Sequence, residues 1–89
     1  MRKTGYAEEI VRGIVDLGGG HELRIERLWI KDHEQEEIRF SWWKDGKFMT
    51  RPPDGTEEEW LRAFKDALRE GVFTEKFLLE LVRAIMTHR

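Results

Sequence analysis

Apolar and polar residues alternate through the middle of the chain, which is the spacing expected of β-strands. Residues 21–31 (HELRIERLWIK) and 36–44 (EEIRFSWWK) both follow this period of two. Asp45-Gly46 comes next, a dipeptide that favours the type I′ turn of a tight hairpin, and residues 47–51 (KFMTR) follow it. The pattern therefore predicts a three-stranded antiparallel meander.

Helical spacing of apolar residues predicts one helix before this meander. Residues 6–17 (YAEEIVRGIVDL) repeat apolar side chains every three or four positions, and Gly18 follows as a stop. Gly13 is unfavourable within a helix, and the β-branched residues of this segment would also suit a strand. We expect a helix here, followed by a turn at residues 18–20 (GGG).

Two more helices are predicted after the meander. Residues 51–53 (RPP) end the last strand, because proline cannot donate a hydrogen bond to a sheet. Thr56, with Glu59 three residues later, forms a capping box that begins a helix, and Gly71 ends this helix. Thr74 caps the last helix, which runs to the end of the chain.

Together these elements predict one α+β domain over residues 1–89. Its order is an N-terminal helix, a three-stranded antiparallel meander and a C-terminal helical hairpin, which packs on the sheet face that carries Trp42. The 39% of apolar residues is enough for a globular fold, although a chain of 89 residues has a thin core.

Composition narrows the possible environment and partners. The chain has no cysteine, and charges interrupt its first apolar run, so we expect no disulfide, no signal peptide and a cytoplasmic location. No segment approaches the roughly 20 apolar residues of a membrane helix. With 16 basic and 18 acidic residues the net charge is −2, which gives no overall attraction to polyanions. Residues 39–52 nevertheless carry four basic side chains against one acidic, a local excess of +3.

The sequence contains no recognisable set of catalytic residues. Ser41 is the only serine and lies within a predicted strand, without the glycines of a nucleophile elbow. Residues 33–37 (HEQEE) lack the second histidine of the HExxH zinc motif, and the three histidines of the chain show no ligand spacing. We therefore expect no enzyme activity, no catalytic residue, no metal site and no cofactor.

Trp42 and Trp43 are adjacent, and successive side chains of a strand point to opposite faces of a sheet. With a two-residue turn after Lys44, Trp42 lies opposite Met49 and Trp43 lies opposite Phe48. One indole therefore enters a one-sided core, and the other needs a different partner.

The second tryptophan supports two interpretations. In the first, the N-terminal helix covers Trp43 and Phe48, which form a second core layer. In the second, these rings remain partly exposed beside Leu28 and Ile30, within a rim of basic residues. Aromatic residues with an arginine rim are typical of protein interfaces. The candidate partner-binding residues are Trp43, Phe48, Arg39, Lys44, Lys47 and Arg51.

The second interpretation predicts a non-enzymatic protein–protein interaction module that forms a homodimer or binds another protein. Replacing Trp43 with alanine is then expected to leave the fold intact and abolish association. The same surface also suits a single-stranded nucleic-acid-binding protein, because aromatic rings stack unpaired bases while cations hold phosphates. The net charge of −2 favours the protein interface over nucleic acid.

The segments SWWKDGKF, RPPDGTEEEW and GVFTEKFLLEL resemble a loose set of small uncharacterised proteins carried by phages and mobile elements of Gram-positive bacteria. The resemblance covers about residues 37–82 and rests on structural motifs. It implies an accessory protein that acts by occupying a host protein. Inhibitors of bacterial defence nucleases, CRISPR nucleases included, belong to that class. The resemblance implies no catalytic residue.

Overall fold

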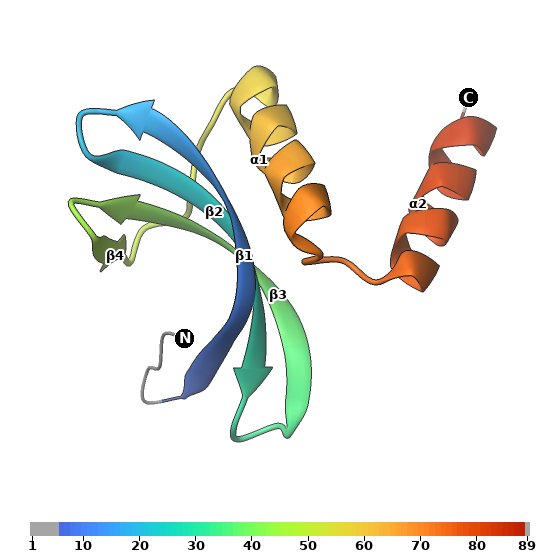
Figure 1. Ribbon diagram of the computed structural model, residues 1–89, viewed down its shortest axis with the longest axis horizontal. Helices are drawn as coiled ribbons and strands as arrows, with labels where there is room; N and C mark the ends of the chain where they lie inside the picture. The colour runs from blue at the N-terminus through green and yellow to red at the C-terminus, as the bar shows by residue number, and fades with distance from the viewer. Residues whose placement is uncertain (1–5, 89) are drawn as a thin grey trace.

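The computed structural model describes residues 6–88, which form an α+β fold of four antiparallel strands followed by two helices (Figure 1). The strands are neighbours in chain order, so the sheet is a simple meander. They are β1 (Ala7–Gly18), β2 (His21–Ile30), β3 (Gln35–Lys44) and β4 (Lys47–Met49), and the helices are α1 (Glu57–Glu70) and α2 (Glu75–Thr87). The α+β class, the antiparallel arrangement and the two C-terminal helices are therefore confirmed.

The predicted N-terminal helix is wrong, because residues 7–18 form β1. This strand pairs antiparallel with β2, from Ala7 opposite Ile30 to Gly18 opposite His21, with an irregularity after Glu9. Its β-branched residues fit an extended backbone, and pairing with β2 outweighs the helical spacing of its apolar side chains. Among the described residues, no helix lies on the sheet face opposite α1 (Figure 1).

Gly13 explains how closely α1 approaches the sheet. A Cβ atom at this position would lie 2.4 Å from the backbone nitrogen of Ala67, far inside van der Waals contact. Ala63 and Ala67 are both fully buried. Small residues on β1 and on α1 therefore let the helix backbone lie directly against the strand. The carboxylate of Asp66 accepts a hydrogen bond of 2.7 Å from the backbone N–H of Ile14 and fixes this crossing.

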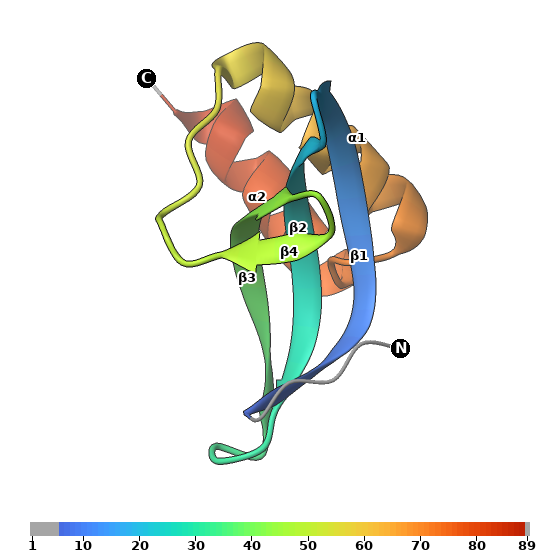
Figure 2. The ribbon, with the colours of Figure 1, turned by 90° about the vertical axis from the view of Figure 1, so that its left-hand side faces the viewer.

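The main core lies between α1 and one face of the sheet, on the outside of the bend in the strands (Figures 1 and 2). It is formed by Val15, Leu23, Ile25, Ala63, Ala67, Val72 and Phe73. Trp42 packs at the margin of this core, as the alternation predicts. The register that places Trp42 opposite Met49 and Trp43 opposite Phe48 is confirmed. Because the sheet bends away from α1, its other face is concave.

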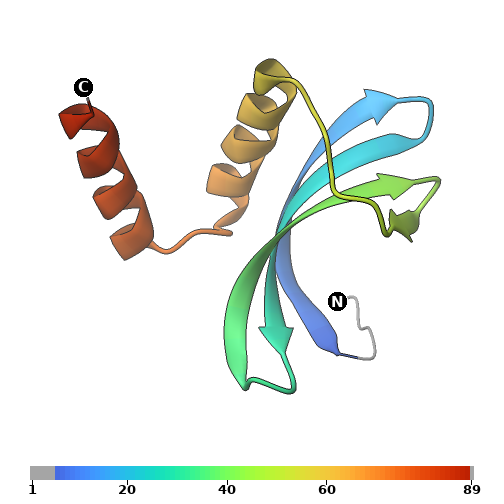
Figure 3. The same cartoon turned by 180° about the vertical axis from the view of Figure 1, so that it is seen from behind.

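Both helices begin where the sequence predicts. Thr56 and Glu59 form the capping box of α1, Gly71 ends α1 with a φ of 75°, and Thr74 caps α2. Of the two helices, however, α1 alone packs on the sheet, and α2 stands apart from the strands and from α1 (Figure 3). The expected packing of a helical hairpin on the Trp42 face is therefore wrong for α2. Neither helix is long and apolar enough to cross a membrane.

Two glycine-containing turns meet at one end of the sheet. Asp45 and Gly46 have φ values of 49° and 78°, the positive values that the predicted type I′ turn requires. The backbone N–H of Asp45 donates a hydrogen bond of 2.8 Å to the carbonyl oxygen of Gly20. A Cβ atom at Gly20, where φ is 83°, would collide with the Asp45 carboxylate. The triple glycine is therefore a turn, as expected, and it connects the β1–β2 hairpin to the β3–β4 hairpin.

Candidate functional site

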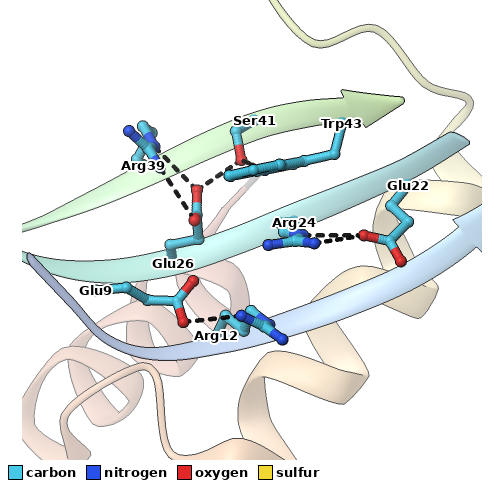
Figure 4. Close-up of polar contacts among 8 residues, drawn as sticks. All are labelled: Glu9, Arg12, Glu22, Arg24, Glu26, Arg39, Ser41 and Trp43. Atoms are coloured by element: carbon cyan, nitrogen blue, oxygen red, sulfur yellow. Dashed lines mark hydrogen bonds and ion pairs between the residues drawn. The ribbon is translucent and has the colours of Figure 1, made fainter. Parts of the chain in front are cut away.

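Ion pairs surround Trp43 on the concave face of the sheet, opposite α1 (Figure 4). The alternation of each strand sends every second side chain to this face. The concave face includes Tyr6, Glu9, Arg12, Glu22, Arg24, Glu26, Arg39, Ser41, Trp43 and Phe48. A small apolar cluster of Ala7, Leu28 and Ile30 lies at one end of the same face. The concave face is therefore mostly polar, whereas the face under α1 is apolar.

Trp43 is buried at the centre of this face, with 1% of its surface exposed. Its indole N–H donates a hydrogen bond of 2.9 Å to Ser41 Oγ, and the Phe48 ring meets it edge-on at 5.5 Å. The Arg24 guanidinium lies 4.0 Å from the ring centre. The predicted exposure of Trp43 is therefore wrong, and so is its predicted cover, because an arginine takes the place of the expected N-terminal helix.

The predicted exposure of the two aliphatic residues of the patch is wrong as well. Leu28 and Ile30 are buried with Ala7 in the small apolar cluster, since β1 lies beside them instead of leaving that part of β2 uncovered. Phe48 differs from them, because it is 41% exposed. Of the four apolar residues expected on the patch, Phe48 is thus the one that reaches solvent.

Glu26 is fully buried and organises the hydrogen bonds around Trp43. Its two carboxylate oxygens accept hydrogen bonds of 2.9 and 3.1 Å from Arg39, and one of them accepts a bond of 2.6 Å from Ser41 Oγ. Burial acts to raise the pKa of Glu26, but the hydrogen bonds from Arg39 and Ser41 and the charge of Arg39 outweigh it. The pKa of Glu26 therefore lies below its ordinary value, and Glu26 is a carboxylate at neutral pH.

Arg39 connects this buried network to the exposed part of the concave face. Its guanidinium donates a hydrogen bond of 2.7 Å to the Tyr6 hydroxyl and lies 4.6 Å from the centre of the Phe48 ring. Burial acts to lower the pKa of Arg39, but its bonds to Glu26 outweigh this and raise the pKa, so the cation is secured. Tyr6 is 46% exposed and Phe48 41% exposed, so one fixed guanidinium contacts two accessible aromatic side chains.

The other two arginines of the concave face are also paired. Arg12 bonds to Glu9 at 2.9 Å, and Arg24 bonds to Glu22 at 2.7 and 3.0 Å. Arg24 Nη1 and Glu9 Oε1 are buried and form no hydrogen bond with the described residues. Each guanidinium thus has a carboxylate partner. Asp16 and Glu37, which lie opposite Glu22 and Leu28, add further acidic groups to the concave face.

The structure brings together three of the six predicted site residues. Trp43, Phe48 and Arg39 share the concave face. Lys44 and Lys47 pair across the β3–β4 turn, where alternation directs them to the side of α1. Arg51 follows β4 and borders a separate depression with Trp42, Pro52 and Asp54. The predicted basic rim is therefore wrong as a continuous rim, since its members lie on different sides of the sheet.

Sequence reasoning missed Arg24, Glu26 and Tyr6 as members of this site. A signal for the first two was present, because Glu22, Arg24 and Glu26 alternate along β2 and place three charges on one face of the sheet. Charges of both signs on one strand face indicate ion pairs with neighbouring strands. Tyr6 gave no such signal, since its place depends on β1 being a strand.

Comparison of the chain with protein-family models, with curated proteins and with solved structures gave no match.

Proposed function

We propose that the protein is a non-enzymatic binding module that holds an unpaired nucleic-acid strand along the concave face. The observation that carries this proposal is the guanidinium of Arg39, which bonds to the hydroxyl of the half-exposed Tyr6 and lies over the half-exposed ring of Phe48. Unpaired bases stack on aromatic rings and on arginine planes. Because Glu26 holds Arg39 in place, these stacking surfaces are ordered before a ligand binds.

The shape of the surface supports a thin and extended ligand. A concave face cannot closely meet the same face of a second copy, because two hollows leave a space between them, and stable interfaces require close packing. A single strand is narrow and flexible enough to follow a curved sheet. A sheet-to-sheet homodimer is therefore not the function that we propose for this face.

The cations around the β3–β4 hairpin have no carboxylate partner among the described residues, but they lie outside the concave face. Within residues 6–88, Lys44, Lys47 and Arg51 form no ion pair with a carboxylate. The arginines of the concave face are already neutralised, so we expect few phosphate contacts. At roughly 0.7 per contact with a single strand, few contacts give a slope shallower than about −2 in a plot of log K against log salt concentration.

Fluorescence anisotropy of a labelled single-stranded oligonucleotide of about 20 nucleotides, titrated with the full chain at several salt concentrations, tests this proposal. Phe48→Ala is expected to weaken binding by about 5-fold to 150-fold, the equivalent of one stacked base. Phe40→Ala is the matched control. Phe40 has the same residue type and the same 41% exposure, but it lies on the opposite face of the sheet.

Three results would contradict the proposal. One is the absence of binding at low salt, and another is an equal loss of affinity in Phe40→Ala and Phe48→Ala. The third is a preference for the duplex over the single strand, since paired bases are not available for stacking on Tyr6 and Phe48.

The resemblance to phage and mobile-element proteins implies a different partner, a host protein such as a defence nuclease. No contact within residues 6–88 favours that partner, and it stays a prediction. Self-association also stays a proposal, and the structure supports a surface for it that differs from the predicted one.

A further inference from the structure

The second helix, α2, has an apolar side that its own chain leaves uncovered. Its exposed apolar residues are Phe77, Leu79, Val82, Ile85 and Met86, with 45% to 75% of each side chain accessible. At 3.6 residues per turn they spread over about 200° of the helix circumference. A helix that packs on one neighbour needs a stripe of only about 100°. The apolar side of α2 is therefore wide enough to contact more than one neighbouring element.

The contacts of α2 with its own chain are confined to its first turns. The Phe77 ring lies 5.2 Å from the ring of Phe73, and Leu78 packs against the edge of the main core. The rest of α2 stands away from the sheet and from α1 (Figure 3). Val82, Ile85 and Met86, in the second half of the helix, are left in solvent.

A second uncovered apolar surface lies on α1 and β3, on the same side of the sheet. Leu61 and Leu68 are about half exposed, and their spacing of two turns places them on one side of α1. Phe40 extends this surface, because its exposed ring contacts Trp60 at 5.5 Å and Phe64 at 5.7 Å. These five residues form the receiving surface.

We propose that two copies of the chain form a dimer in which α2 of each copy packs on the receiving surface of the other. Both surfaces belong to the same chain, so a single twofold axis satisfies both at once. The area is also sufficient, since eight half-exposed apolar side chains at roughly 100 Å² each bring about 800 Å² per copy, the amount that a stable interface buries on each partner. They are Phe40, Leu61, Leu68, Phe77, Leu79, Val82, Ile85 and Met86.

Charged residues border both surfaces. Lys76 and Arg83 flank Leu79 on α2, in a depression that Glu75 and Glu80 also line. Glu57 and Glu58 border the depression beside Trp60 and Leu61 on the receiving surface. Packing of α2 in this depression brings Lys76 and Arg83 of one copy beside Glu57 and Glu58 of the other, and these pairs favour this orientation over other apolar contacts.

The dimer goes beyond the proposed function and does not depend on it. Both surfaces lie on the side of the sheet that carries α1, and the concave face lies on the other side (Figures 1 and 3). Each copy in the dimer therefore keeps its concave face accessible. Loss of nucleic-acid binding and loss of the dimer are then separate results.

Light scattering behind size-exclusion chromatography tests the proposal, with the full chain at about 10 to 200 μM and at about 0.1 and 1 M salt. The wild-type chain is expected at twice its 10.7 kDa mass at both salt concentrations, because the contact is mainly apolar. Ile85→Glu is expected to give 10.7 kDa with an unchanged far-UV circular dichroism spectrum, since Ile85 is 63% exposed in the single chain. Ile10→Glu replaces an exposed isoleucine of β1 and is expected to keep the dimer mass.

A wild-type mass of 10.7 kDa over the whole range would overturn the proposal, and so would dissociation of the Ile10→Glu variant to the same extent as Ile85→Glu.

Charge reversal tests the receiving surface. The variants Glu57→Lys/Glu58→Lys and Lys76→Glu/Arg83→Glu are each expected to dimerise more weakly alone and to form a mixed dimer when combined. An unchanged dimer dissociation constant in both variants and in their mixture would overturn the assignment of α1 as the receiving element.

Discussion

The guanidinium of Arg24 lies 4.0 Å from the centre of the Trp43 ring, so a charged side chain covers this indole. Arg24 is held in that position by two hydrogen bonds to Glu22 on the same strand, and Trp43 is held by its bond to Ser41. The aliphatic part of an arginine can cover apolar surface while its head keeps polar partners. Trp43 therefore contributes to the stability of the fold and is not available to a partner.

We predict that Trp43→Ala strongly destabilises the protein. Removing a buried tryptophan costs about 3 to 5 kcal/mol, because apolar contacts are lost and a cavity remains. The hydrogen bond to Ser41 is lost as well. A single domain has only about 5 to 15 kcal/mol of stability, so this loss removes a large share of it. Urea unfolding followed by circular dichroism measures the change.

Phe48→Ala is the control for this prediction, because Phe48 contacts Trp43 but keeps 41% of its surface in solvent. Its free energy of unfolding is expected to fall by less than that of Trp43→Ala. If Trp43→Ala unfolds at the same urea concentration as the wild type, the indole is not part of the core.

The N-terminal segment shows where the sequence was insufficient to predict the fold. The apolar residues of β1 recur with helical spacing, while its β-branched residues favour a strand, so local preferences conflict. Pairing with β2 makes the segment a strand, and this pairing cannot be recognised from the local sequence pattern. Gly13 was the useful signal, since glycine within a strand often marks the close approach of another backbone.

We predict that Gly13→Ala destabilises the protein by at least 1 to 3 kcal/mol, the usual cost of overpacking. The added methyl group meets the backbone of Ala67, which cannot move aside as a flexible side chain can. Ala67→Gly in the same chain is therefore not expected to restore stability, because it leaves that backbone in place. Thermal unfolding of both variants measures this. An unchanged melting temperature for Gly13→Ala would show that α1 does not lie directly against β1.

The strand register of the candidate site could be predicted from the sequence, but the exposure of Trp43 could not. Alternation along β3 and the Asp45-Gly46 turn correctly placed Trp43 opposite Phe48. Exposure depends on the bend of the sheet and on which charged groups of β2 lie beside the ring, and neither follows from the composition of β3. The local excess of +3 over residues 39–52 also does not describe one surface, because alternation sends its cations to opposite faces of the sheet.

The capping box of α1 gives a prediction that rests on local structure alone. Thr56 Oγ1 accepts a hydrogen bond of 3.1 Å from the backbone N–H of Glu59, and Glu59 Oε1 accepts one of 2.9 Å from the N–H of Thr56. Thr56→Ala is expected to lower the free energy of unfolding by about 1 kcal/mol, and Thr56→Ser to change it little. Urea unfolding of both variants measures the difference. Equal losses in the two variants would show that the hydroxyl group is not the cause.

The buried pair of Glu26 and Arg39 predicts how stability depends on pH. The pKa of Glu26 is lower in the folded chain than its unfolded value of about 4.3, so the unfolded state binds more protons in acid. The contribution of Glu26 to the free energy of unfolding is therefore fully present above about pH 5, and it is lost as the pH falls through the pKa of the folded state. Urea unfolding between about pH 7 and pH 3 is expected to show this loss.

Glu26→Gln separates this contribution from that of the other carboxylates. The variant is expected to be less stable at pH 7 by about 3 to 5 kcal/mol, because Arg39 loses its buried carboxylate partner. Its stability is also expected to fall less steeply in acid than that of the wild type, since the amide that replaces the carboxylate does not titrate.

Glu57→Gln, at an exposed position of α1, is the matched control and is expected to keep the wild-type slope. The pKa of Glu37 is also lowered, by hydrogen bonds from Gln35 and His33, but wild type and variants share this group. A Glu26→Gln variant with the wild-type acid slope would show that Glu26 does not stabilise the fold as a carboxylate.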